Sequence, residues 1–332
     1  MNKRAKSFWY YWERFGILAI LVFAVIVFSL IDPIFFDQSP RILLPSSLLN
    51  VLCRSAIVAI PAMGMTFAIC SGGFDLSVGS IVGLSTCVWA AALPTYGIVT
   101  ATFLTLAAGA VCGFLNGLAI TKLKIATFVA TLSMSLIIRS VALIATDGSK
   151  QMISRTDNPE AKFFSQNYSI FGQQLQLVQL IMMVLVFVVG YLVYRYTRFG
   201  VYARSIGSHE PSARTSGLPV DRTLIVVFML TGVTASASAM ITSSQLMQGA
   251  ATLGIGFELE VITATILGGT SLSGGKGNIW GSMVAAIMLA LTRSGLNLLG
   301  IIDEYQRLSI GFILLLALTV SGIQEIAKEG RK

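Results

Sequence analysis

The chain has 332 residues, of which 55% are hydrophobic and only 11% are charged, and its formal net charge is +8. Soluble domains carry about 25% charged residues, and the mean hydropathy here is +0.80, so this composition excludes an ordinary soluble protein. Apolar runs of about 20 residues recur, and each is long enough to cross a hydrocarbon core about 30 Å thick. The sequence therefore predicts an all-α polytopic membrane protein.

The N-terminus places Lys3, Arg4 and Lys6 before an apolar stretch at 16–30. A secretory signal peptide has the same layout, but no small-residue cleavage site follows, and many further apolar runs do. We therefore expect an uncleaved first membrane span.

The apolar pattern predicts about ten spans in a single transmembrane domain that covers residues 1–332. The second and seventh spans contain enough polar positions to be broken or tilted, and the eighth is short for a complete crossing. The predicted ranges are 15–36, 46–70, 76–93, 97–120, 125–145, 174–194, 223–247, 259–273, 278–299 and 305–323.

Basic residues predict the orientation of these spans. With ten spans, 15 of the 23 lysines and arginines fall on the same side as both termini, and cytoplasmic loops are the ones that carry such an excess. We therefore expect both termini and a polar segment at about 195–222 in the cytoplasm, and a loop at about 146–173 in the periplasm. Contact with the bilayer explains the positive charge without a nucleic-acid partner.

The polar segment at 195–222 interrupts the apolar pattern with five arginines and two acids. Its middle, residues 206–218, has the composition of a short capped helix between two glycines. A soluble partner protein could bind such a helix on the cytoplasmic side. The candidate coupling residues are Gly207, Ser208, His209, Glu210, Arg214, Ser216 and Gly217.

Two segments share the frame Gly-Gly-x-x-Leu-Ser-x-Gly, at 72–79 and at 268–275, each between an apolar run and a new helix. Glycines permit unwinding, and unwound backbone at membrane depth is tolerated only beside protein or a water-filled cavity. We expect Asp75 or Ser271 to cap the helix that follows. The candidate residues for a translocation path or helix-break loops are Gly72, Gly73, Asp75, Ser77, Gly79, Gly268, Gly269, Ser271 and Ser273.

Small residues in two predicted spans indicate close helix packing. Glycines recur every four residues at 109, 113 and 117, and Ala235 and Ala239 form a similar face. Arginines at 54, 139 and 293 either pair internally or reach toward an interface. Acidic residues at 258, 260 and 303 are interpreted as solvated loop charges.

Residues that could catalyse a reaction or bind a metal or a nucleotide are sparse. The four cysteines at 53, 70, 87 and 112 lie apart in apolar segments, which favours a packing role, and the single histidine has no neighbouring metal ligands. No Gly-x-x-x-x-Gly-Lys-Ser/Thr motif is present, so the chain has no recognisable means of binding ATP itself. We expect no enzyme activity, no metal and no cofactor bound by this chain.

Three ordered motifs resemble those of monosaccharide ABC importer permeases of the ribose and arabinose type. The first is SGGFDLSVGS at 71–80, the second is IGSHEPSARTSGL at 206–218, and the third joins GFELEVI at 256–262 to LGGTSLSGGKG at 267–277. The second resembles the cytoplasmic coupling loop of that family, although Ser208 and His209 replace its usual Gly-Asn, and Ser212 stands where alanine is common.

The resemblance implies a type II ABC importer-like permease in the bacterial inner membrane. It implies a second permease copy, a cytoplasmic ATPase that uses ATP, and a periplasmic sugar-binding protein that supplies most of the selectivity. The permease then moves a monosaccharide into the cytoplasm by alternating access. The alternative is an ion-coupled secondary transporter with broken helices, for which Asp75 is the only fair intramembrane carboxylate.

Overall fold

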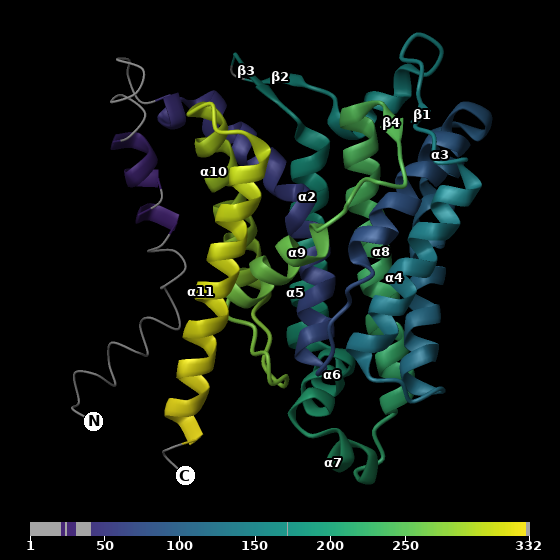
Figure 1. Cartoon of the computed structure of the whole chain (residues 1–332), viewed down its shortest axis with the longest axis vertical. Helices are drawn as coiled ribbons and strands as arrows, with labels where there is room; N and C mark the ends of the chain where they lie inside the picture. The colour runs from purple at the N-terminus through teal and green to yellow at the C-terminus, as the bar shows by residue number, and fades with distance from the viewer. Residues whose placement is uncertain (1–20, 24, 31–40, 171, 330–332) are drawn as a thin grey trace.

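The computed structural model describes residues 21–23, 25–30, 41–170 and 172–329, and its long helices run roughly along the longest axis of the molecule (Figure 1). Short strands and two 3-10 helices, η1 and η2, occur among them. In chain order the elements are η1 (Arg41–Leu43), α2 (Pro45–Cys70), α3 (Val78–Thr121), α4 (Thr127–Ala145), β1 (Gln151–Met152), η2 (Pro159–Ser165), β2 (Tyr168–Ile170), β3 (Gln173–Leu175), α5 (Leu177–Tyr196), α6 (Arg198–Ser208), α7 (Glu210–Thr215), α8 (Val220–Leu246), β4 (Gln248–Gly249), α9 (Phe257–Leu267), α10 (Ile279–Leu298) and α11 (Asp303–Glu329).

Among the described residues, six helices are long and apolar enough to cross a membrane: α2, α3, α4, α5, α8 and α10. Five of them coincide with predicted spans, and the helical, polytopic class is confirmed. The predicted first span at 15–36 falls largely outside the described residues, so the count of ten stays a prediction.

Helix α3 is where the predicted spans and the observed helix bounds differ most. The sequence predicts two spans, at 76–93 and 97–120, and the structure joins them as 44 residues that change direction at Gly97, whose backbone is non-helical (φ 73°, ψ 174°). Ser85 Oγ lies 2.8 Å from Ser236 Oγ, and a Cβ at Gly109 would overlap the same Ser236 atom. Positions before and after Gly97 therefore meet one α8 residue, so the chain forms a helical hairpin of two spans.

Helices α2 and α8 are continuous over 26 and 27 residues, so of the two predicted possibilities for the second and seventh spans, broken or tilted, the structure excludes a break. Their polar residues do not break them, since the hydroxyls bond to carbonyls one turn earlier, as Thr66 Oγ1 does to Ala62 O at 2.7 Å. The short eighth span is confirmed, since α9 has only 11 residues.

Helix α8 lies at the centre of the core between α3 and α2. A Cβ at Gly109 or Gly113 would overlap the α8 backbone at Gly232 or Phe228, and one at Gly64 of α2 would overlap Thr234. These glycines let helix backbones approach closely, as membrane helices require when packing replaces the hydrophobic effect. The predicted glycine stripe is confirmed as a packing seam.

The two ends of the bundle carry different structures (Figure 1). Helices α6 and α7 form one end, and the segment between α4 and α5, with β1, η2, β2 and β3, covers the other. There β1 pairs with β4, with Gln151 opposite Gly249. The predicted polar segment at 195–222 and the predicted outer loop at 146–173 thus lie at opposite ends.

Candidate functional site: the contact of α6 with two glycine loops

The polar segment folds into two helices rather than one. His209 begins α7, where its Nδ1 accepts a hydrogen bond from Ser212 N at 3.2 Å, and Gly217 follows the helix with φ +76°. The predicted short helix before Gly217 is therefore confirmed. The sequence does not predict helix α6, which places Gly207 and Ser208 inside a helix instead of in a flanking turn.

Helix α6 packs through a narrow apolar side. Its buried residues are Gly200, Ala203 and Ile206, which recur every three positions and so share one face. Ile206 forms a small apolar cluster with Ala213 of α7 and Leu224 of α8. This packing fixes the end of α6 against the membrane helices.

The C-terminal end of α6 reaches both glycine loops, and we call this contact the α6 junction (Cys70, Gly207, Gly274 and Gly275). Gly275 N donates to Cys70 O at 2.8 Å, so the start of the 71–77 loop and the 268–278 loop touch directly. A Cβ at Gly207 would overlap Cys70 O and lie 2.7 Å from Gly275 N. Only glycine allows this approach, and a Cβ at Gly274 would likewise overlap Gly207 O.

Tyr194, in the last turn of α5, links the same elements through its hydroxyl. The oxygen accepts a hydrogen bond from Gly277 N at 2.7 Å and lies 3.5 Å from Cys70 Sγ. Arg204 of α6 stacks 4.8 Å from the Tyr194 ring centre, and its Nη1 donates to Tyr194 O at 3.2 Å. No sequence motif marks Tyr194, because its partners come from three separate parts of the chain.

Asp75 is fully buried in the first loop. Its Oδ1 accepts hydrogen bonds from Ser77 N at 2.9 Å, Ser77 Oγ at 2.6 Å and Asn116 Nδ2 at 3.4 Å. Thr231 Oγ1 of α8 donates to the other carboxylate oxygen. Within the described ranges no ion pair forms with Asp75.

The structure corrects the predicted helix caps. Helix α3 begins after Ser77, so Asp75 bonds the N–H of the capping residue and also joins α3 to α8. The N-cap of α10 is Asn278, whose side chain accepts from Gly281 N at 3.0 Å. Ser271 lies too early in the loop to cap, and its backbone instead bonds Lys276 and Gly274.

The other predicted loop residues lie around these contacts. Gly73 packs beside Thr127 and Phe228, and a Cβ at Gly79 would overlap Glu258 and the Gly254 backbone. Gly268 lies against the first turn of α10, and a Cβ there would overlap Ser282 N. Gly72, Gly269 and Ser273 complete the two loops.

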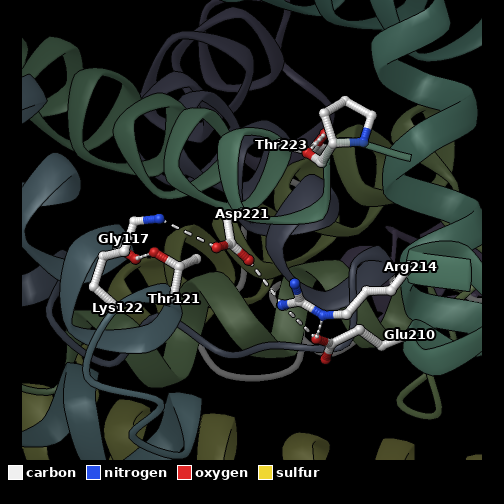
Figure 2. Close-up of polar contacts among 8 residues, drawn as sticks. Gly117, Thr121, Lys122, Glu210, Arg214, Asp221 and Thr223 are labelled. Atoms are coloured by element: carbon white, nitrogen blue, oxygen red, sulfur yellow. Dashed lines mark hydrogen bonds and ion pairs between the residues drawn. The ribbon is translucent and has the colours of Figure 1, made fainter. Parts of the chain in front are cut away.

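An ion-pair network joins α7 to the adjacent helix ends (Figure 2). Arg214 pairs with Glu210 at 2.9 Å and with Asp221 at 2.8 Å, and Asp221 also pairs with Lys122 at 3.3 Å. Hydrogen bonds to Asp221 and Glu210 raise the pKa of Arg214, so it stays charged. Ser216 ends α7 with its N–H on Ser212 O at 3.0 Å.

A cavity of about 1120 Å³ lies toward the other end of the bundle, between α2, η2 and α8 to α11. None of the nine predicted path residues lines it. Glu260 is not a solvated loop charge, because it forms an ion pair with Arg293 of α10. Arg54 lines the cavity, and Arg139 donates to Leu253 O at 2.8 Å.

The four cysteines are free and buried. Within the described ranges, no three His, Cys, Asp or Glu side chains gather into a metal site.

Comparisons with known proteins agree along almost the whole chain. A family model described as "Branched-chain amino acid transport system / permease component" matches residues 47–318. The chain is similar to the ribose import permease protein RbsC of Escherichia coli K12, with 34% identity over 315 residues and 93% of each chain covered. The corresponding RbsC of Bacillus subtilis strain 168 is 36% identical, covering 92% of this chain and 91% of its own. The L-arabinose transport system permease protein AraH of Escherichia coli K12 is 33% identical, covering 98% and 95%.

Proposed function

Since the chain belongs to the permease family of ABC importers, and is a sugar importer permease like its ribose and arabinose relatives, we propose that α6 and α7 are the helices through which a separate ATPase moves it. As a multi-pass inner-membrane permease of this class, it works with an ATPase and a substrate-binding protein. The ATPase acts on α6 and α7, and their movement displaces the two glycine loops.

One observation carries the proposal: the end of α6 touches both glycine loops through backbone atoms. Gly207 lies against Cys70 O and Gly275 N, with no side chain between them. A packed interface of this kind shifts as a unit instead of deforming gradually. A displacement of α6 is therefore passed to the two places where spanning helices begin again, at α3 and at α10.

Alternating access then follows from the position of the loops. Helix α7 presents exposed polar residues at the end of the bundle, where an ATPase surface can bind. Different affinities of the ATP-bound and ATP-free partner for two arrangements of α6 shift the population between them. In this mechanism the ATPase partner binds and hydrolyses ATP, and the permease makes and breaks no covalent bond.

The orientation that fits this mechanism puts the α6–α7 end and both termini in the cytoplasm. The segment with β1, η2, β2 and β3 then faces the sugar-binding protein. We further propose that two copies of this chain form the permease pair. The excess of basic residues on the α7 side supports this orientation.

The test is reconstitution in liposomes with candidate ATPase and sugar-binding partners, followed by uptake of labelled ribose or arabinose. ATP-dependent uptake that requires both partners is the expected result. ATP-independent uptake by this chain alone would contradict the proposal.

Gly207→Ala tests the α6 junction in the same liposomes. The added methyl collides with backbone, and overpacking costs about 1–3 kcal/mol, which shifts a two-state equilibrium by about 5–150-fold. We expect the ATPase to remain bound while uptake falls sharply. The control is Gly311→Ala, because a Cβ there meets no atom within 4 Å, and equal uptake by both variants would refute the assignment.

The ion-coupled alternative is not favoured, since the relatives are ABC importer permeases. Asp75, its candidate carboxylate, is surrounded by hydroxyl and amide donors that hold the first glycine loop, α3 and α8 together. Proton- or sodium-driven uptake that is lost in Asp75→Asn would support this alternative.

A further inference from the structure

The cavity near the strand-covered end is lined by more polar than apolar groups in a chain that is otherwise apolar. Its wall includes Asn50 and Arg54 of α2, Gln245 of α8, Glu260 of α9, and Arg293 and Asn297 of α10. Ligand pockets usually measure about 300–1,000 Å³, so a volume of about 1120 Å³ holds a small solute with water. Such a wall inside a membrane helix bundle calls for a polar occupant.

Arg54 is the clearest sign of that occupant. It lies ten residues after the N-cap of α2, which is about 15 Å along the helix axis. Its side chain is exposed to the cavity and forms no ion pair within the described ranges. A charged residue at membrane depth is costly and marks a substrate or ion pathway when it faces a cavity.

The part of the wall formed by α9 and α10 offers both donors and acceptors. Glu260 and Arg293 form an ion pair across α9 and α10, with side chains 12% and 34% exposed. The pair holds the carboxylate and guanidinium in place while leaving part of each at the cavity surface. Asn297 is oriented by Gln306 Nε2, which donates to its Oδ1 at 2.8 Å. Because Asn297 Nδ2 and the Arg54 guanidinium donate while Glu260 accepts, the wall matches hydroxyl groups, which do both.

The same wall fits poorly to a branched apolar side chain. Burying valine, leucine or isoleucine against charged and amide groups would leave those groups without hydrogen-bond partners, at a cost for each. The family model carries a branched-chain amino-acid description. The chemistry of the wall favours a sugar over such an amino acid as the solute in this cavity.

We propose that this cavity is a binding site for a monosaccharide inside the permease itself, with Arg54, Glu260 and Asn297 contacting its hydroxyls. The inference rests on the proposed importer function and adds a claim to it. The permease selects among sugars after the binding protein has released them, instead of offering an unselective passage.

The first test is equilibrium binding of radiolabelled ribose to the purified permease–ATPase complex without the sugar-binding protein. Saturable binding that arabinose displaces and leucine does not is the expected result. Binding that leucine displaces equally, or no saturable binding in a complex that carries out ATP-driven ribose uptake with its binding protein, overturns the inference. In the second outcome the importer function stands and only the internal site fails.

The second test compares uptake by Arg54→Ala and Asn297→Ala with the control Lys124→Ala, an exposed cation between α3 and α4 that does not line the cavity and lies outside the strand-bearing segment. Hydrogen bonds to charged groups are strong enough for at least about a tenfold loss. We expect the KM for uptake to rise about tenfold and the ratio of ribose to arabinose uptake to change, with ATPase stimulation by the binding protein retained. If Arg54→Ala does not assemble with the ATPase, Asn297→Ala takes its place in the test. An assembled variant with unchanged KM and unchanged sugar selectivity overturns the proposed binding site.

Discussion

At the scale of single residues, the α6 junction depends on backbone atoms and one hydroxyl. Gly207 contributes the absence of a side chain, and Tyr194 contributes an oxygen that satisfies a loop N–H. Both residues act by position, since neither provides a group that could react with a substrate. Small changes at these two places therefore test coupling without touching a binding group.

Tyr194→Phe removes only the hydroxyl. Gly277 N–H, which is partly buried, then loses its acceptor, and an unsatisfied donor there costs at most about 1–3 kcal/mol, the value for a fully buried one. We expect more ATP hydrolysed per sugar transported, while the ATPase stays bound. Coupled assays of phosphate release and sugar uptake measure this ratio.

The control for that variant is Tyr196→Phe on the same helix end, where the tyrosine is 73% exposed. Its hydroxyl has no hydrogen-bond partner in the described part of the chain, so the ratio should not change. An unaltered ratio in Tyr194→Phe would show that the hydroxyl does not transmit motion.

At the scale of helices and loops, the two continuous helices α2 and α8 form the fixed part of the fold. Helix α8 is held on one side by the glycines of α3 and on the other by Gly64 of α2. The loops at 71–77 and 268–278, in contrast, join to α6 mainly through the α6 junction. This difference separates a packed core from the segments that a partner could displace.

Gly109→Leu tests the packed part. A side chain there would enter the space of Gly232 and Ser236, and overpacking of this kind costs about 1–3 kcal/mol. We expect a lower Tm of the purified protein in detergent. Val111→Leu is the matched control, because Val111 is 56% exposed on the outer face of the same helix, and an equal fall in Tm for both would contradict the seam.

At the scale of the whole molecule, the polar features are divided between the two ends. The α6–α7 end carries the ion-pair network of Lys122, Arg214, Asp221 and Glu210 (Figure 2). The other end carries the strands and the polar cavity. An importer needs two different ends, because the ATPase that drives it and the substrate that it carries reach it from opposite sides of the membrane.

Labelling of single introduced cysteines tests which end of the molecule faces which side of the membrane. Lys150→Cys and Thr215→Cys place exposed thiols at opposite ends, while the four native cysteines are buried. In intact spheroplasts a membrane-impermeant maleimide should label Lys150→Cys alone, and in inside-out vesicles Thr215→Cys alone. The unaltered chain is the control, and labelling of both positions from one side would reject the orientation.

Elements whose signal is local could be predicted from the sequence. Apolar length predicts the spans of α2, α4, α5, α8 and α10, since the energy of inserting a helix depends on its own residues. The spacing of Gly109, Gly113 and Gly117 predicts a packing seam without naming its partner. The capping residues and Gly217 predict the short helix α7.

Features formed by distant residues could not be predicted. Helix α6 has a narrow apolar side, and the contacts of Ala203 with the core and of Ile206 with α7 and α8 make its packing evident. The roles of Tyr194 and Asp75 depend on hydrogen bonds that span 83 and 156 positions. The interpretation of Glu260 as a loop charge is wrong because its partner Arg293 is 33 residues away.

The sequence by itself determined the helical membrane class of this protein, the positions of most of its long apolar helices and the family motifs it carries, because each depends on neighbouring residues and their transfer into lipid. The tertiary structure alone decided that α6 touches both glycine loops and that a polar cavity lies at the opposite end. Both depend on which helices pack together, and in lipid that choice follows the fit between surfaces far apart in the chain.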